Sequence, residues 1–151
     1  MEEFKSIDDI LDFAINSEQE AVDFYTQLAE QSKIDEMKQV FTQFAKEEMR
    51  HKSRLMNVKE TGSYTMSEKK VKDLKISDYV VDVKPHPEMS YQEALIVAMK
   101  KEKSAFKLYM NLSEQAPNPD MKELFLSLAQ EESRHKLRFE LEYDEFVLRE
   151  N

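Results

Sequence analysis

The sequence predicts an all-α fold, a four-helix bundle made of two duplicated helical hairpins joined by a long crossover. Composition gives the first indication: the 151 residues include one glycine and four prolines, and strong helix formers such as Glu, Lys, Leu and Ala dominate. Duplication gives the second, because residues 14–57 align without a gap on residues 98–141 with 17 identities in 44 positions. This length is usual for one domain, so we expect a single domain over 1–151.

The first hairpin is expected over about residues 7–58. Ser6, followed three residues later by Asp9, can cap a helix that begins near Ile7, and apolar residues then recur every three or four positions. A short polar break at 32–35 precedes a second helix with the same periodicity. Because the loop is short, we expect the two helices to be antiparallel neighbours.

The second hairpin is expected over about residues 91–149. Ser90 and Glu93 form the pattern of a capping box, which marks the start of its first helix. Pro117 and Pro119 end that helix, and Pro119 suits the first turn of the helix that follows.

The crossover, about residues 59–89, is much longer than an ordinary loop in a compact domain. It must therefore carry the chain between two distant helix ends. Within it, residues 71–81 are expected to form either a short helix or an extended segment packed along the outside of the bundle. His86 has no counterpart in the repeat and is expected to be a surface loop residue.

Acidic and imidazole side chains interrupt the apolar stripes of the four helices. One glutamate occupies a core position on the first helix of each hairpin, and a Glu-x-x-His pair lies on one face of each second helix. Lys33 is midway between Glu18 and Glu48, so an antiparallel hairpin brings both acids to the same height. The predicted metal ligands are Glu18, Glu48, His51, Glu102, Glu132 and His135.

Buried carboxylates need compensating positive charge, because each unpaired one costs several kcal/mol. Two divalent cations supply the four positive charges that four carboxylates require. The chain has no cysteine, which excludes disulfides, thiolate zinc sites, iron–sulfur clusters and a rubredoxin-type iron centre. Mixed oxygen and nitrogen ligands suit iron or manganese better than calcium or magnesium. We therefore expect two iron ions, with manganese or zinc as alternative occupants.

Other polar residues near the predicted ligands have two candidate roles. Tyr25 and Tyr109 lie seven residues after Glu18 and Glu102, where they can fill the core or hydrogen-bond to a ligand carboxylate. No further catalytic residue is expected beyond the metal ligands. Residues one position off the inner stripes are expected on the solvated flanks, namely Glu47, Arg50, Lys52, Glu131, Arg134 and Lys136.

Charge and hydropathy exclude several classes of partner. A net charge of −9 disfavours nucleic acid and anionic lipid, which both require a basic face. The amino-terminal residues lack the basic and apolar regions of a secretion signal, and no apolar run is long enough to span a bilayer. We expect a soluble cytoplasmic protein that forms a homodimer or a higher homo-oligomer.

The motifs Glu48-Met-Arg-His51 and Glu132-Ser-Arg-His135, each with its inward glutamate and tyrosine, resemble the di-iron motif of the ferritin-like superfamily and most closely that of rubrerythrins. The resemblance implies a ferritin-like bundle. It also implies that Glu48 and Glu132 bridge the metals, that the other two acids bind terminally, and that each histidine holds one metal.

The sequence departs from rubrerythrins in two respects. Met99 and Ala105 stand three residues before and after Glu102, where rubrerythrins carry an additional glutamate. A rubredoxin domain needs cysteines, which this chain lacks, so electrons would come from a separate protein or from the iron itself.

The resemblance and the ligand set together favour a di-iron oxidoreductase that reduces hydrogen peroxide or dioxygen with electrons from an external donor, in the manner of a rubrerythrin peroxidase acting against oxidative stress. A ferroxidase or an iron-binding or storage protein is the alternative, for which the acidic charge is mild support. A helical scaffold that no longer binds metal is the third class, and it is disfavoured because every ligand position is intact in both halves.

Overall fold

The computed structural model describes residues 3–81, 85–86 and 88–150. By contact density the chain divides into two compact units, Met1–Asp73 and Leu74–Asn151, and each is built around one helical hairpin. All regular secondary structure in the described residues is helical, as the composition predicts. None of the helices in these ranges is both long and apolar enough to cross a membrane.

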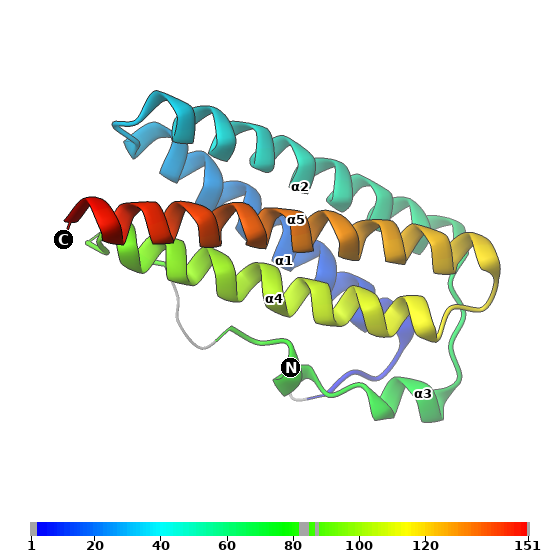
Figure 1. Ribbon diagram of the computed structural model, residues 1–151. Helices are drawn as coiled ribbons and strands as arrows, with labels where there is room; N and C mark the ends of the chain where they lie inside the picture. The colour runs from blue at the N-terminus through cyan, green and yellow to red at the C-terminus, as the bar shows by residue number, and fades with distance from the viewer. Residues whose placement is uncertain (1–2, 82–84, 87, 151) are drawn as a thin grey trace. The chain divides into compact units, whose positions relative to one another are not determined.

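The first unit contains α1 (Ile7–Gln31) and α2 (Asp35–Thr61), which pack against each other as an antiparallel pair (Figure 1). The predicted cap is confirmed, because the Ser6 side chain accepts a hydrogen bond of 3.2 Å from the backbone N–H of Asp9. Toward solvent, Lys52 Nζ donates to Gln19 Oε1 at 2.6 Å and so links the two helices. The boundaries agree with the predicted hairpin to within a few residues.

Gly62 ends α2 in a left-handed conformation, with φ 63° and ψ 26°. Two backbone bonds close the last turn: Gly62 N–H donates to the Lys59 carbonyl and Ser63 N–H donates to the Val58 carbonyl, both at 3.3 Å. This is the arrangement in which glycine commonly terminates a helix, because a side chain would be strained at positive φ. The chain then continues into α3 (Glu68–Asp73), a short helix that buries Val71.

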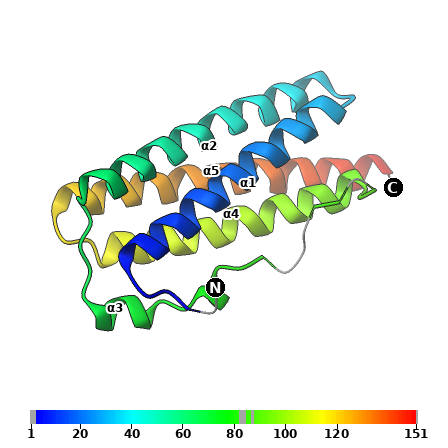
Figure 2. The same cartoon turned by 180° about the vertical axis from the view of Figure 1, so that it is seen from behind.

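The second unit begins with the 3₁₀ turn η1 (Ile76–Asp78) and contains α4 (Tyr91–Glu114) and α5 (Pro119–Glu150). Figure 2 shows α4 running along α5, in agreement with the dense contacts between them. The Ser90 and Glu93 capping box is present as predicted. At the start of α5, Asn118 Oδ1 accepts from the Met121 backbone N–H at 3.0 Å.

In the described part of the crossover, α3 and η1 are helical and no strand is formed, so of the two alternatives left open for residues 71–81 the helical one is correct for residues 71–73 and 76–78. Within the second unit, Tyr79 connects this segment to α4 through two hydrogen bonds. Its backbone carbonyl accepts one from the Ser104 hydroxyl, and its side-chain hydroxyl accepts one from Asn111 Nδ2 at 2.5 Å. Residues 82–84 and 87 of the predicted crossover lie outside the described residues. His86 is exposed, as expected.

Candidate metal centre

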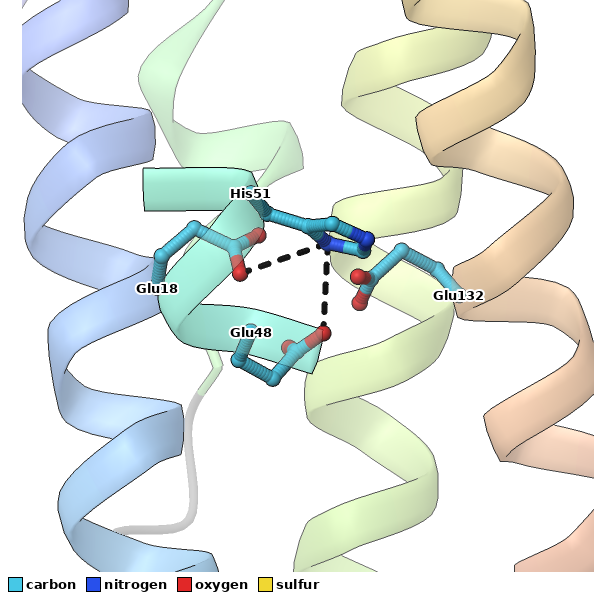
Figure 3. Close-up of side chains that lie close together, drawn as sticks. All are labelled: Glu18, Glu48, His51 and Glu132. Atoms are coloured by element: carbon cyan, nitrogen blue, oxygen red, sulfur yellow. Dashed lines mark ion pairs between the residues drawn. The ribbon is translucent and has the colours of Figure 1, made fainter. Parts of the chain in front are cut away.

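The first hairpin brings three predicted ligands together inside its core. Glu18 projects from α1, and Glu48 and His51 project from consecutive turns of α2 (Figure 3). His51 Nδ1 lies 3.5 Å from Glu18 Oε2 and 3.2 Å from Glu48 Oε1. One potential ligand atom from each of the three residues lies within 4.8 Å of the others. All three residues are at most 2% exposed, so two acids and an imidazole share one buried space.

The inward direction of these side chains follows from the helix period. Residues three and four positions away along a helix share its face, and those neighbours are buried apolar residues. Glu18 stands between Ala14 and Ala21, which are 1% and 5% exposed. Glu48 and His51 occupy the α2 stripe that buries Phe41, Phe44, Leu55 and Val58. Once the apolar stripe is buried, the polar residues in the same stripe are carried into the core with it.

The second hairpin repeats this arrangement. Glu102 projects from α4, and Glu132 and His135 project from α5; each is at most 1% exposed. His135 Nδ1 lies 3.5 Å from Glu102 Oε1, the same separation as between His51 and Glu18. One ligand atom from each of Glu102, Glu132 and His135 lies within 4.8 Å of the others. The duplication seen in the sequence is therefore a duplication of a buried three-residue group.

Charge in the first hairpin explains the protonation of His51. Burial on its own lowers the pKa of the imidazole, because it disfavours the charged form. Hydrogen bonds and charge from Glu18 and Glu48 act in the opposite direction and are stronger together, so the pKa of His51 rises from 6.5 to about 10. In the absence of a metal, the imidazole thus takes up a proton and becomes the cation that the two acids need.

The donor set fits a divalent transition metal in each hairpin. The same ring atom, Nδ1, faces the acids in His51 and in His135, which identifies it as the nitrogen available for coordination. Two carboxylates and one imidazole, buried and without thiolates, are the mixed ligands that iron and manganese accept. Each buried group could therefore hold a metal ion, and its acids offer charge to balance one divalent cation.

Within the described residues, the acids and histidines that cluster closely enough to hold a metal ion are all among the six ligands predicted from the sequence. Tyr25 and Tyr109 are 0% and 1% exposed, so both fill the core. Tyr109 also packs against Phe125, with ring centroids 6.1 Å apart. The predicted hydrogen bonds from the two tyrosine hydroxyls to ligand carboxylates stay predictions.

The expectation of a solvated flank is correct for Arg50 and Arg134, which are exposed, but wrong for Glu47. Glu47 is only 4% exposed, and its Oε2 accepts a hydrogen bond of 3.1 Å from Gln43 Nε2, one turn earlier on α2. A stripe on a helix is wider than the residues at its centre, so a position next to the stripe can still be covered.

Sequence reasoning also missed a second buried acid, Glu142, which is 3% exposed near the carboxyl end of α5. Its Oε2 accepts hydrogen bonds from the Tyr91 hydroxyl at 2.9 Å and from Arg149 Nη2 at 3.2 Å. Burial, followed by the bond to Glu142, raises the pKa of Tyr91. The repeat contained the signal, because Glu142 is the counterpart of the buried Val58 at the offset of 84.

Comparison with known proteins shows the family of the chain and agrees with the fold. The family model for rubrerythrin matches residues 9–87 and 93–151. A Thermotoga maritima protein, whose name describes it as a ferritin-like diiron-carboxylate protein, is 21% identical with a TM-score of 0.76; the match covers 96% of this chain and 99% of that one. A hypothetical protein from Pyrococcus furiosus is 26% identical with a TM-score of 0.68, over 89% of this chain and 85% of that one. No curated protein matches the sequence. The predicted fold class, an all-α ferritin-like bundle, is confirmed.

Proposed function

Because the chain belongs to the rubrerythrin family, we propose that it is a di-iron oxidoreductase that reduces hydrogen peroxide or dioxygen with electrons from a separate donor protein. One observation carries the proposal: each hairpin buries the same group of two glutamates and one histidine, with their ligand atoms within 4.8 Å of one another. Two such groups supply four acids and two imidazoles, which is the ligand set of a dinuclear carboxylate centre.

We assign the ligands by the family motif. By that motif Glu48 and Glu132 would bridge two irons, Glu18 and Glu102 would bind terminally, and His51 and its counterpart His135 would each hold one iron, with Nδ1 as the nitrogen that faces the acids. Four carboxylates then balance two ferrous ions. His51 must release its proton for its Nδ1 to bind metal, so metal and proton compete for the same nitrogen.

When bound, the iron pair supplies electrons for cleaving the O–O bond of the oxidant, a reaction that consumes two electrons and two protons for each peroxide reduced to water. The protein provides the ligands and a dry environment. Apolar side chains on the same stripe of α2 are buried one turn before Glu48 and one turn after His51, namely Phe44 and Leu55, which are at most 5% exposed. Their exclusion of water keeps the charges of the ligands strong and limits side reactions.

The source of the electrons follows from the residue types in the sequence. Residues 1–151 include no cysteine with which to bind an iron–sulfur or rubredoxin-type centre. The donor is therefore proposed to be a separate redox protein.

The test begins with anaerobic reconstitution with ferrous iron and elemental analysis of the product. We expect two irons per chain, lost in a Glu48→Ala, Glu132→Ala double variant. A Glu30→Ala, Glu114→Ala variant is the matched control, since it removes two exposed acids at another pair of positions related by the repeat. Retention of iron in this control separates loss of ligands from loss of two negative charges.

The reaction is tested next by mixing the ferrous protein with peroxide or with dioxygen in stopped flow. A peroxidase is expected to oxidise within seconds with peroxide, to react more slowly with dioxygen, and to cycle when a reductant is supplied. Less than half an iron per chain after reconstitution, in both wild type and the double variant, would remove the foundation of the proposal.

A ferroxidase with an iron-handling role is the second candidate, supported by the net charge of −9, which favours attraction of cations. It differs in two measurable ways. Dioxygen would then be the preferred oxidant, and iron would accumulate beyond two ions per chain in a large oligomer. A protein that stays at two irons per chain under excess iron excludes storage.

A further inference from the structure

The outer face of α4 carries three exposed lysines, Lys100, Lys103 and Lys107, which we call the lysine face. Because each residue of an α-helix advances by about 100°, these three positions fall within about 60° of one another. Residues 94–113, all of which the structure describes, contain a single acid, Glu102, and that acid is buried. Over this part of α4 the lysine face is therefore not offset by any exposed acid of its own helix.

The duplicated hairpin provides an internal comparison for this surface. At the offset of 84, the three lysines correspond to Asn16, Gln19 and Asp23 of α1. The whole of α1, residues 7–31, contains no lysine or arginine. Both helices nevertheless bury an inner stripe that includes one glutamate. Helix formation and burial of the stripe do not require the lysines, because α1 achieves both without them.

The lysine face lies beside the segment of the crossover that packs on α4 within the second unit. Lys107 Nζ is 5.9 Å from the centroid of the Tyr79 ring. Ser104 and Asn111, which hydrogen-bond to Tyr79, lie on the same side of α4 as Lys107. The segment adds one exposed lysine and one exposed acid, whose charges cancel, namely Lys75 and Asp78. The face therefore keeps its positive charge, and the ring of Tyr79 orients one of its lysines.

The lysine face lies across α4 from a predicted iron ligand. Glu102 is about 100–160° around the helix from the three lysines and is 1% exposed. A helix with its side chains is about 10–12 Å across. A redox protein bound to the lysine face would therefore be separated from Glu102 by about the width of one helix, and electrons tunnel between protein redox centres over such distances.

We propose that the lysine face of α4 is the docking surface of the electron donor, and that the donor is a small acidic redox protein. A chain of net charge −9 repels an acidic partner over most of its surface, so a local basic face determines where such a partner binds. This inference rests on the proposed function, which requires an external donor. Two docking events, each passing one electron from the reduced donor to the site, replace the two electrons that the reduction of one peroxide consumes.

Stopped-flow reduction of the oxidised, iron-reconstituted protein by a reduced plant-type ferredoxin, an acidic iron–sulfur protein, tests the proposal. The second-order rate constant should fall at least about 10-fold between about 20 mM and about 300 mM salt, because screening removes the attraction. Lys100→Asn, Lys103→Gln, Lys107→Asp installs the residues of the equivalent α1 positions and should lower the rate constant at low salt by at least about 10-fold. Lys100→Glu, Lys103→Glu should have a similar effect while it leaves the contact between Lys107 and Tyr79 in place.

The matched control makes the same change in net charge at exposed lysines of the first unit. Lys33→Asn, Lys38→Gln, Lys46→Asp should change the rate constant by less than about 3-fold. Circular dichroism confirms that each variant is folded. A control that slows the reaction as much as the lysine-face variant overturns the proposal, because net charge alone would then account for the effect.

Two further measurements separate failure of the docking surface from failure of the proposed function. Isothermal titration of oxidised ferredoxin into the metal-free chain requires no reaction, and the lysine-face variant should bind at least about 10-fold more weakly than wild type. Reduction by the methyl viologen radical and oxidation of the ferrous protein by peroxide should be the same in both. A ferrous wild-type protein that peroxide does not oxidise refutes the proposed function.

The docking surface alone is refuted if ferredoxin binds and reduces wild type and the lysine-face variant equally well. It is also refuted if the substitutions abolish self-association of the chain, or binding of duplex DNA or of phosphatidylserine vesicles, and leave ferredoxin binding unchanged. In those cases the occupant of the lysine face is a second copy, a nucleic acid or a membrane, and not an acidic redox protein.

Discussion

Replacing Glu18 with methionine should stabilise the metal-free protein even though it removes a predicted metal ligand. In the metal-free first hairpin, two acidic side chains share a buried space with one imidazole, so there is one more acid than His51 can pair with. Glu18→Met leaves one acid, Glu48, and one imidazolium, His51, 3.2 Å apart. The remaining pair is neutral overall. Methionine keeps a side chain of similar volume and tolerates irregular packing.

The magnitude follows from the cost of buried charge. Replacing a whole buried ion pair or triad with apolar side chains of similar volume is often neutral or raises the free energy of unfolding by about 1–4 kcal/mol, whereas removing one partner is destabilising when it leaves a buried charge unpaired. In Glu18→Met no charge is left unpaired, because Glu48 still lies 3.2 Å from His51, so the first case applies. For a domain of this size, 1 kcal/mol corresponds to roughly 2–4 °C in Tm. We therefore expect the metal-free Tm to rise by about 2–16 °C in Glu18→Met. The substitution also removes the attraction between His51 and Glu18, which offsets part of the increase in stability. We therefore expect a value in the lower half of this range.

Thermal unfolding in a chelator and in excess ferrous iron measures both effects. Wild type should gain about 3 kcal/mol from metal at 100 times its Kd, by mass action. Glu18→Met should gain much less from iron although it begins at a higher Tm. Glu30→Met, an exposed position on the same helix, should change the metal-free stability by less than about 0.5 kcal/mol. If Glu18→Met instead lowers the metal-free Tm by several degrees, the surplus buried acid is not a liability and the reasoning fails.

The remaining predictions concern pH and the crossover. Because the pKa of His51 in the folded metal-free protein is raised from 6.5 to about 10, its stabilising charge pairing is complete below pH 6.5 and is lost as the pH rises through 10. Urea titrations should show a loss of up to about 5 kcal/mol over this window, absent in His51→Gln. Gly62→Ala should lower the free energy of unfolding by about 1 kcal/mol in the same assay. The cost comes from backbone strain at φ 63° alone, because an added Cβ meets nothing within 4 Å. A neutral result would mean that the turn relaxes. Tyr79→Phe removes the bond from Asn111 and should cost about 1 kcal/mol, with no change in iron content.

Much of the fold was predictable because short-range signals and the repeat agree. The capping residues Ser6 and Ser90 mark helix starts that the structure confirms. The site residues were predictable for a related reason. An acid such as Glu18 is unusual on a stripe of buried alanines. Because an acid recurs at the same position of the second repeat, as Glu102, a chance occurrence is a poor explanation and a shared role is a better one.

Features that depend on packing between distant segments were not predictable from the sequence. Glu47 is buried because the covered face of α2 is wider than its central stripe, and periodicity reports only the centre of a face. Tyr79 rests on α4 through Ser104 and Asn111, contacts that span 25 and 32 residues of sequence. No local pattern in the crossover encodes such a partner.

The two repeats have the same residues at the candidate metal site but different residues at other positions. The residues that would hold metal are identical in both hairpins, and each of them offers one ligand atom to a metal ion. Away from them the repeats diverge: Val58 corresponds to the buried Glu142, and the exposed Ser53 corresponds to Leu137. Glu142 is tolerated in the core because Tyr91 and Arg149 hydrogen-bond to it, whereas Leu137 has no such compensation within the described part of α5 and stays 56% exposed. The two halves therefore share the residues of the candidate metal site, while the outer face of α5 is apolar at positions where that of α2 is polar.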